Sequence, residues 1–475
     1  MKLRTSHCLG TVALLALSAC SSPSLLPPSK VAAPIAESWQ APLPHQGNVG
    51  ALSQWWQQQG DPLLVELIEA AQTVSPTVAN ALTRIEDARA KQATAYGALM
   101  PNLSAQASAT RGVTQPQVPA ATTLQGGLQA SWELDLVGAN RAVNNAATAQ
   151  VEGSRAQWHD ARVSVAAEVA NLYYAQSSCM QLMEIDKQDA ASQRETARLA
   201  DINAKAGFTG ASVVALARAS AADSNNRLLQ QAAQCDINTK ALVALTGIQE
   251  PELRKKQLVA FAHPIKATPI SVASVPAQTI AQRPDIFAAE RDVVVAAATV
   301  GSAKAQRYPR LSLNGSIGAV HVSSGGTEQN ESTWSFGPLA LSVPLYDGGQ
   351  RVAAVKSAET AYQASIASYQ SKVRQAVREV EEALITLQST EARESDAQTA
   401  TQGYAASRDA TQARYGQGLA SLLELEDARR LALAAQSAHV TLQLQRNQAW
   451  VALYRASGGG FEPSNANEPA TAHAD

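Results

Sequence analysis

The chain has 475 residues, with 38 basic against 40 acidic side chains and a formal net charge of −2 at pH 7. This near balance excludes the strongly basic surface of a nucleic-acid-binding protein. Aromatic residues make up only 5% of the sequence, which is few for a large catalytic core. Long segments rich in Ala, Gln, Ser and Leu dominate instead, and they favour closely packed helices.

Residues 1–19 have the features of a secretory signal peptide. Lys2 and Arg4 form a basic start, and residues 9–17 are apolar but too few to span a bilayer. The following Leu-Ser-Ala-Cys, ending at Cys20, resembles the bacterial lipoprotein signal, in which the cysteine is lipidated. That resemblance implies a lipid anchor on Cys20 in the outer membrane. The alternative is an ordinary signal peptide with a cysteine placed there by chance.

Two further cysteines, Cys179 and Cys235, lie at equal sequence distances on either side of Gly207. Gly207 is the expected turn of a helical hairpin, so the two cysteines would sit at similar heights on antiparallel helices. In an oxidising periplasm they could form a disulfide. The other interpretation is two small, buried apolar residues. Their spacing does not decide between the two.

The sequence contains an internal two-fold repeat. Pro76 aligns with Pro284, and Pro101 aligns with Pro309, at the same offset. A repeat of this length is typical of a duplicated architectural unit. The predicted organisation is a signal peptide at 1–19, a lipidated tether at 20–54, repeat 1 at 55–247, a crossover at 248–275, repeat 2 at 276–457 and a disordered tail at 458–475.

Each repeat begins with a helix and two strands. Ser75 and Pro76 form a good helix start, because Ser caps the N-terminus and Pro is tolerated at the first helical position. Alternation of small or apolar with polar residues then predicts strands. The predicted elements are a helix at 76–99, strands from Leu103 and from Leu124, their counterparts at 311–320 and 334–343, and loops at 112–122 and 323–332.

A very long helical hairpin completes each repeat. The proline-free stretches 141–205 and 351–414 predict near-continuous helices, and return helices are expected at 211–246 and 420–456. A helix of this length spans on the order of 95–100 Å at 1.5 Å per residue. The charged residues in these helices make them too polar to enter a bilayer. Their uninterrupted periodicity indicates coiled-coil packing.

Strands of about ten residues are long enough to cross a bilayer when tilted. Four strands cannot close into a barrel, and a lipid environment does not allow an open sheet edge. Several chains must therefore contribute strands to one barrel. Three chains would supply twelve, which is enough to leave a lumen.

Four motifs together resemble the outer-membrane factor family, the TolC-like and OprM-like channels of tripartite efflux pumps. They are Arg-Pro-Asp-Ile at 283–286, Tyr-Pro-Arg-Leu-Ser-Leu at 308–313, Trp-Glu-Leu-Asp-Leu at 132–136 and Pro-Leu-Tyr-Asp-Gly-Gly at 344–349. The resemblance implies an α+β membrane protein and a homotrimer. Its twelve-stranded β-barrel, with four strands per chain, would continue as a long α-helical coiled-coil barrel across the periplasm.

The same resemblance implies a passive export duct for small toxic compounds or drugs. Its partners would be a periplasmic adaptor (membrane fusion) protein, an inner-membrane transporter of the resistance-nodulation-division (RND) class, and outer-membrane lipid. The sequence identifies neither the exported substrate nor the particular pump and adaptor. Other interpretations are a lipid-anchored coiled-coil scaffold or adhesin without a pore, and a type I protein-secretion duct.

Residues 414–429 resemble the family's tip of the last helical hairpin, where acidic residues ring the pore. By position, Glu424 and Asp427 match, and their spacing places them on one helix face. In a trimer they would bring up to six carboxylates around one axis, a ring that favours cations. Ala420 stands where TolC has a basic residue that holds the gate closed, so the mode of locking is open. The alternative is a solvated helix face.

An enzyme is the weakest interpretation. The seven His residues are scattered, and we find no metal-ligand spacing or nucleophile motif. His159 and Asp160 lie on a long predicted helix and are expected to face solvent. We therefore expect no cofactor, no metal, no nucleic-acid partner and no catalytic residues.

Overall fold

The structure is a computed structural model, and it describes residues 27–28, 32–33, 39, 55–58, 60–113, 119–262 and 280–461. The predicted signal peptide, the lipidation site Cys20 and most of the tether lie outside the described residues. So do residues 263–275 of the crossover and 462–475 of the tail. Predictions for those segments stay predictions.

The chain divides into two units. One contains residues 1–33, 83–155 and 288–371, and the other contains residues 34–82, 156–287 and 372–475. The long helices continue from one unit into the other. Each unit is described by itself.

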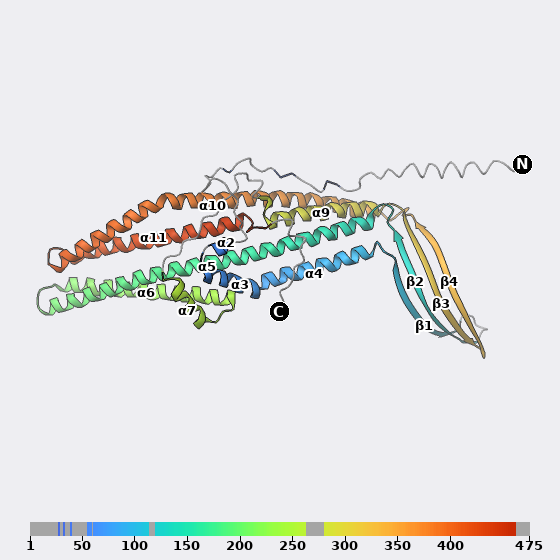
Figure 1. The fold of residues 1–475 in the computed structure, drawn as a ribbon, viewed down its shortest axis with the longest axis horizontal. Coiled ribbons are helices and arrows are strands. Elements are labelled where there is room, and N and C mark those ends of the chain that lie inside the picture. The colour runs from blue at the N-terminus through green and yellow to red at the C-terminus, as the bar shows by residue number, and fades with distance from the viewer. Residues whose placement is uncertain are drawn as a thin grey trace. The chain divides into compact units, whose positions relative to one another are not determined.

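Four strands form a single antiparallel sheet with the order β1-β2-β3-β4 (Figure 1). The strands are β1 (Asn102–Gly112), β2 (Ala121–Leu134), β3 (Arg310–Ser324) and β4 (Thr327–Ser342). Both predicted strand pairs are present. The register pairs Gly127 with Gly318, and a Cβ atom on either glycine would lie 2.7 or 2.6 Å from a carbonyl oxygen of the other strand. Glycine therefore allows β2 and β3 to approach closely here.

The predicted loop at 323–332 is wrong. Only Gly325 and Gly326 connect β3 to β4, both with positive φ. A two-residue turn of this kind matches the twist of antiparallel strands. The polar residues from Thr327 onward then pair with β3 as strand, because pairing with a neighbour overrides a polar composition.

The long helices begin and end within a few residues of their predicted positions. α4 (Pro76–Gly97) leads into β1, and α9 (Pro284–Ala305) leads into β3. α5 and α10 contain 67 residues each, so each is about 100 Å long. Within the described residues, no helix has an apolar stretch long enough to cross a membrane. The two hairpins are α5 (Ala139–Lys205) with α6 (Ala211–Thr246), and α10 (Gln350–Gly416) with α11 (Leu422–Ala456).

An aspartate begins each long helix. Asp135 accepts the backbone N–H groups of Asn140 and Arg141 at 3.3 and 2.8 Å. Asp347 accepts the N–H groups of Gly349 and Arg351 at 3.0 and 3.1 Å. The backbone hydrogen bond from Arg351 lowers the pKa of Asp347, as expected for a carboxylate at a helix N-terminus. The Trp-Glu-Leu-Asp-Leu motif thus spans the end of β2 and the approach to α5, and the Pro-Leu-Tyr-Asp-Gly-Gly motif lies between β4 and α10.

Three short helices were not predicted: α2 (Trp55–Gln58), α3 (Pro62–Val74) and α7 (Glu250–Ala260). Asp61 caps α3 by accepting the N–H groups of Leu63 and Leu64 at 3.1 and 3.2 Å. α7 occupies the first part of the predicted crossover. α3 and α7 each have a proline near the first helical position, which is the signal that reveals such starts in a sequence.

The chain just after α11 is packed rather than disordered. Phe461 is buried and contacts the rings of His159 and Phe287 at 5.2 and 5.8 Å between centroids. A Cβ atom on Gly458 would lie 2.1 Å from the carbonyl oxygen of Gln282. Only glycine fits this approach. Residues 458–461 are therefore packed, whereas the sequence predicted a disordered tail from residue 458 onward.

Candidate functional site

The tip of the second hairpin is a short turn between α10 and α11. Gly418 adopts positive φ there, and Ser421 caps α11. The Ser421 hydroxyl accepts the backbone N–H of Glu424 at 3.2 Å, and the Glu424 carboxylate accepts the Ser421 N–H at 2.6 Å. This reciprocal capping box fixes the first turn of α11.

The predicted pore residues both lie in these first turns, and both have local partners. The backbone N–H of Ser421 lowers the pKa of Glu424, so its carboxylate stays charged. Asp427 is exposed and pairs with Arg430 at 3.1 Å on the same helix. Arg414 approaches Glu424 at 3.9 Å. Exposed pairs of this kind contribute little stability. The structure therefore gives Glu424 a capping role and leaves Asp427 on a solvated face.

Sequence reasoning missed a buried polar cluster deeper in the same hairpin. Arg429 is only 4% exposed, although it is charged. Its Nη1 donates to Thr196 Oγ1 at 2.9 Å and to Glu426 Oε1 at 3.1 Å, with Gln193 Oε1 at 3.4 Å. Its Nη2 donates to Gln412 Oε1 at 2.7 Å. These five residues, from α5, α10 and α11, are called the Arg429 cluster below.

Apolar contacts hold the two hairpins together near their tips. Leu425 is fully buried and Leu422 nearly so. They form a cluster with Ala200 on α5 and Ala217 on α6, and Tyr415 packs against it. The start of α11 therefore rests on the first hairpin through both apolar and buried polar contacts.

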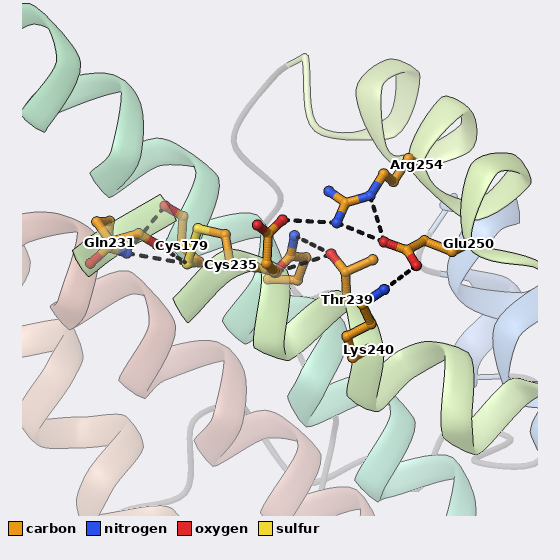
Figure 2. Close-up of polar contacts among 9 residues, drawn as sticks. Cys179, Gln231, Cys235, Thr239, Lys240, Glu250 and Arg254 are labelled. Atoms are coloured by element: carbon orange, nitrogen blue, oxygen red, sulfur yellow. Dashed lines mark hydrogen bonds and ion pairs between the residues drawn. A yellow bond between two sulfur atoms is a disulfide. The ribbon is translucent and has the colours of Figure 1, made fainter. Parts of the chain in front are cut away.

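The structure joins the two cysteines of the first hairpin in a disulfide (Figure 2). Cys179 on α5 and Cys235 on α6 have Cα atoms 5.6 Å apart, and both side chains are buried. Gln231 donates its side-chain amide to the carbonyl oxygen of Cys179 at 3.3 Å. Farther along, Gln176 donates to Thr239 at 3.1 Å, again joining α5 to α6.

Ion pairs attach α7 to α6 beside this disulfide, as Figure 2 shows. Arg254 contacts Asp236 at 2.8 Å and Glu250 at 2.9 Å. Lys240 also pairs with Glu250. The hydrogen bonds from Lys240 and Arg254 lower the pKa of Glu250. The first hairpin thus carries the disulfide and, beside it, the helix α7, which ion pairs attach to α6.

The Arg-Pro-Asp motif joins three helices in the same unit. Arg283 is buried and pairs with Asp285 at the start of α9 and with Glu379 on α10, both at 2.8 Å. Its Nη1 also donates to the carbonyl oxygen of Ala456 at 3.1 Å, so it satisfies a free carbonyl at the end of α11. The motif connects the start of α9 and the end of α11 to the middle of α10.

The expectation that His159 and Asp160 face solvent is wrong, since both are partly buried. Burial lowers the pKa of His159 to about 4, with a further contribution from Arg162. Burial also raises the pKa of Asp160. Aromatic packing against Trp158 and Phe461 explains the position of the imidazole. Within the described ranges, no group of His, Cys, Asp or Glu could hold a metal ion.

The described residues combine one four-stranded antiparallel sheet with two long helical hairpins, and comparison with known proteins identifies the class to which this combination belongs. Among solved structures, the outer-membrane channel OprN matches with a TM-score of 0.81 and 26% identity, over 92% of this chain and 99% of that one. Outer membrane protein OprJ of Pseudomonas aeruginosa is 30% identical over 473 residues, which cover 94% of each protein. The toluene efflux pump outer membrane protein TtgI of Pseudomonas putida is 29% identical over 95% of this chain and 98% of that protein.

Residues 67–248 and 275–459 match the family described as outer membrane efflux protein. The chain belongs to this family, and it is an outer-membrane component of an efflux system. The resemblance drawn from its motifs is therefore confirmed.

Proposed function

We propose that this chain forms, as a homotrimer, the outer-membrane channel of a tripartite efflux pump. In this proposal it is a passive duct without enzymatic activity. An inner-membrane RND transporter and a periplasmic adaptor deliver small toxic compounds or drugs to it. The names of the relatives support this assignment, since TtgI belongs to a toluene efflux pump and OprN is an outer-membrane channel.

The observation that carries the proposal is the open four-stranded sheet. Its strands contain 11 to 16 residues, and about 9 to 11 suffice to cross a bilayer. Within the part of the chain that the structure describes, β1 and β4 are each paired on one side only. Unpaired backbone groups at a sheet edge are too costly in lipid. Three chains that pair β1 with β4 of a neighbour would make a closed barrel of twelve strands.

The side chains of the sheet support a lipid-facing wall. Trp334 and Phe336 on β4 are 78% and 83% exposed, and Leu339 and Leu341 are each 62% exposed. Trp334 and Phe336 alternate with Ser335, so they point to the same face. Such a set of exposed apolar side chains indicates a surface that lipid or another chain covers.

The N-terminus completes the proposal. Lipidation at Cys20 would add an outer-membrane lipid anchor to the barrel. A single acyl chain binds membranes weakly, so the barrel would be the main attachment and the lipid an accessory one. The two-fold repeat has a structural purpose here, because one copy contributes only two strands and one hairpin.

The oligomeric state of the purified protein in detergent tests this arrangement. We expect a homotrimer by mass measurement, both for the native chain and for the Cys20→Ala variant. A folded monomer would contradict the shared barrel. A trimer that forms no pore would instead favour the lipid-anchored scaffold or adhesin, and export of a polypeptide would favour the type I secretion duct.

A further inference from the structure

A cavity of about 280 Å³ lies among α2, α3, α5, the end of α11 and the residues that follow α11. All of these parts belong to the unit formed by residues 34–82, 156–287 and 372–475. Four aromatic side chains contribute to its wall, namely Trp56, His159, Tyr454 and Phe461. A cavity of about 150 Å³ is enough to hold benzene. This one therefore has room for a single ring that carries a small polar group.

Contacts within the wall keep these rings in place. Trp56 and Tyr454 pack edge to face, with their ring centroids 4.7 Å apart. The rings of His159 and Phe461 are in contact as well, at 5.2 Å between centroids. The Tyr454 hydroxyl donates to the carbonyl oxygen of Gly459 at 3.4 Å, which fixes the chain after α11 against the helix. The cavity is thus preformed, as small-molecule sites usually are.

The indole N–H of Trp56 lacks an acceptor. This side chain is only 7% exposed, and in the part of the chain that the structure describes no atom accepts its Nε1–H. Burial raises the pKa of Tyr454, and the neighbouring indole opposes that rise, but the phenol and the indole form no hydrogen bond of acceptable geometry. Buried donors are nearly always paired. An unpaired donor in a cavity wall therefore points to a bound acceptor.

Arg162 brings a positive charge to the same wall. Its Nε donates to Gln72 Oε1 at 3.1 Å, and the Gln72 amide donates back to the Arg162 carbonyl oxygen at 3.1 Å. The guanidinium also lies over the ring of Trp158, 4.9 Å from its centroid. These contacts orient the side chain but leave its two Nη groups without a hydrogen bond among the described residues. A carboxylate is the partner that such a guanidinium binds best.

The other titratable groups of the wall allow an anion to bind. Burial, with a further contribution from Arg162, lowers the pKa of His159 to about 4, so the imidazole is neutral at pH 7. Glu69 also lines the cavity, but it is exposed, and water screens an exposed charge. The two unpaired donors, on Trp56 and Arg162, thus decide which chemical group fits.

We propose that this cavity binds a small aromatic carboxylate, with one ring and one anionic group. The ring packs against Tyr454 and Phe461, and the carboxylate accepts hydrogen bonds from Trp56 and Arg162. The site includes no residue of the hairpin tip or of the Arg429 cluster, and it does not rest on the proposed export function. Because α2, α3, α5 and the chain after α11 all contribute to it, the ligand also holds these parts of the unit together.

The test is isothermal titration calorimetry of the purified full-length protein with benzoate at neutral pH. We expect saturable binding of one benzoate per chain. Trp56→Phe keeps a ring and removes the N–H, whereas Arg162→Met removes the charge. Each should weaken binding about tenfold or more, the scale of one hydrogen bond to a charged group. The matched control is Arg198→Met on α5, because Arg198 is exposed and pairs with Glu195 on the same helix. It should bind benzoate like the native protein.

A folded native protein without saturable benzoate binding would overturn the inference. Native affinity in Trp56→Phe or in Arg162→Met would do the same, and if Arg162→Met does not fold, Trp56→Phe alone decides. Benzylamine has a similar ring with the opposite charge and should not bind. Benzylamine binding as tightly as benzoate would refute the assignment to carboxylates. A protein that conducts ions but binds no benzoate would lose this site and keep its proposed function.

Discussion

Arg283 and Asp285 form a two-point ion pair at the start of α9, with Nε to Oδ1 at 3.0 Å and Nη2 to Oδ2 at 2.8 Å. Burial alone would raise the pKa of Asp285, but hydrogen bonds and charge from Arg283 outweigh it and lower that pKa. Because Arg283 also binds Glu379 and the carbonyl of Ala456, one buried side chain connects α9, α10 and the end of α11.

Replacing Arg283 with Met should destabilise the protein strongly. The change leaves Asp285 and Glu379 without their buried partner, and breaking such a pair costs about 3–5 kcal/mol. Thermal unfolding of the purified protein measures the effect. The control is Arg378→Met on α10, whose pair with Glu382 is exposed and should contribute less than about 1 kcal/mol. Equal losses in the two variants would refute the structural role of the Arg-Pro-Asp motif.

Stability should fall as the pH is lowered from about 6.5 to about 4, and His159 should account for part of that fall. The pKa of His159 is lowered to about 4 in the folded protein, whereas an unfolded His titrates near 6.5. Between these values the unfolded state binds more protons, so acidification favours unfolding. The melting temperature of His159→Asn should depend less on pH in this window. Parallel profiles for the native protein and the variant would contradict the assignment.

The disulfide should stabilise the first hairpin measurably. It closes a segment of 56 residues, and links of this kind contribute about 2–4 kcal/mol. Replacing both Cys179 and Cys235 with Ser should therefore lower the melting temperature without changing the helix content. Thiol titration of the non-reduced, denatured protein provides the direct check. Two free thiols from this pair would rule the disulfide out.

Much of the architecture could be predicted because its signals are local. The absence of proline over residues 141–205 and 351–414, with a glycine turn after each, is enough to predict both hairpins. The polar start of β4 could not be predicted in this way, because Thr327 becomes strand only through pairing with β3. Short helices such as α7 are easily missed, since they carry few turns of periodicity.

The difference between local signals and long-range contacts also decides which residues of the site could be predicted. Glu424 and Asp427 could be proposed as pore residues because a motif marks the hairpin tip. The capping box between Ser421 and Glu424 was not predicted and is seen only in the structure. Arg429 looks like any charged residue of an exposed helix. Its partner Gln193 lies 236 positions away in the sequence, so only the folded arrangement reveals that Arg429 is buried.

Neutralising the tip carboxylates should reduce the preference of the channel for cations. Glu424→Gln with Asp427→Asn removes both charges but keeps similar side-chain shapes, so the helix cap is disturbed less than by alanine. A ring of carboxylates attracts cations, and its loss should shift the reversal potential in a salt gradient toward zero. Glu195→Gln on α5 serves as an exposed control. An unchanged reversal potential would remove Glu424 and Asp427 from the pore.

The central claim is that three copies of this chain enclose a continuous pore. Single-channel recording of the purified full-length trimer in a planar lipid bilayer tests it most directly. We predict discrete conductance steps in the native protein and also in the Cys20→Ala variant, because the barrel and not the lipid encloses the pore. Correctly folded trimers that insert but never conduct, in either form and at any applied voltage, would contradict the account.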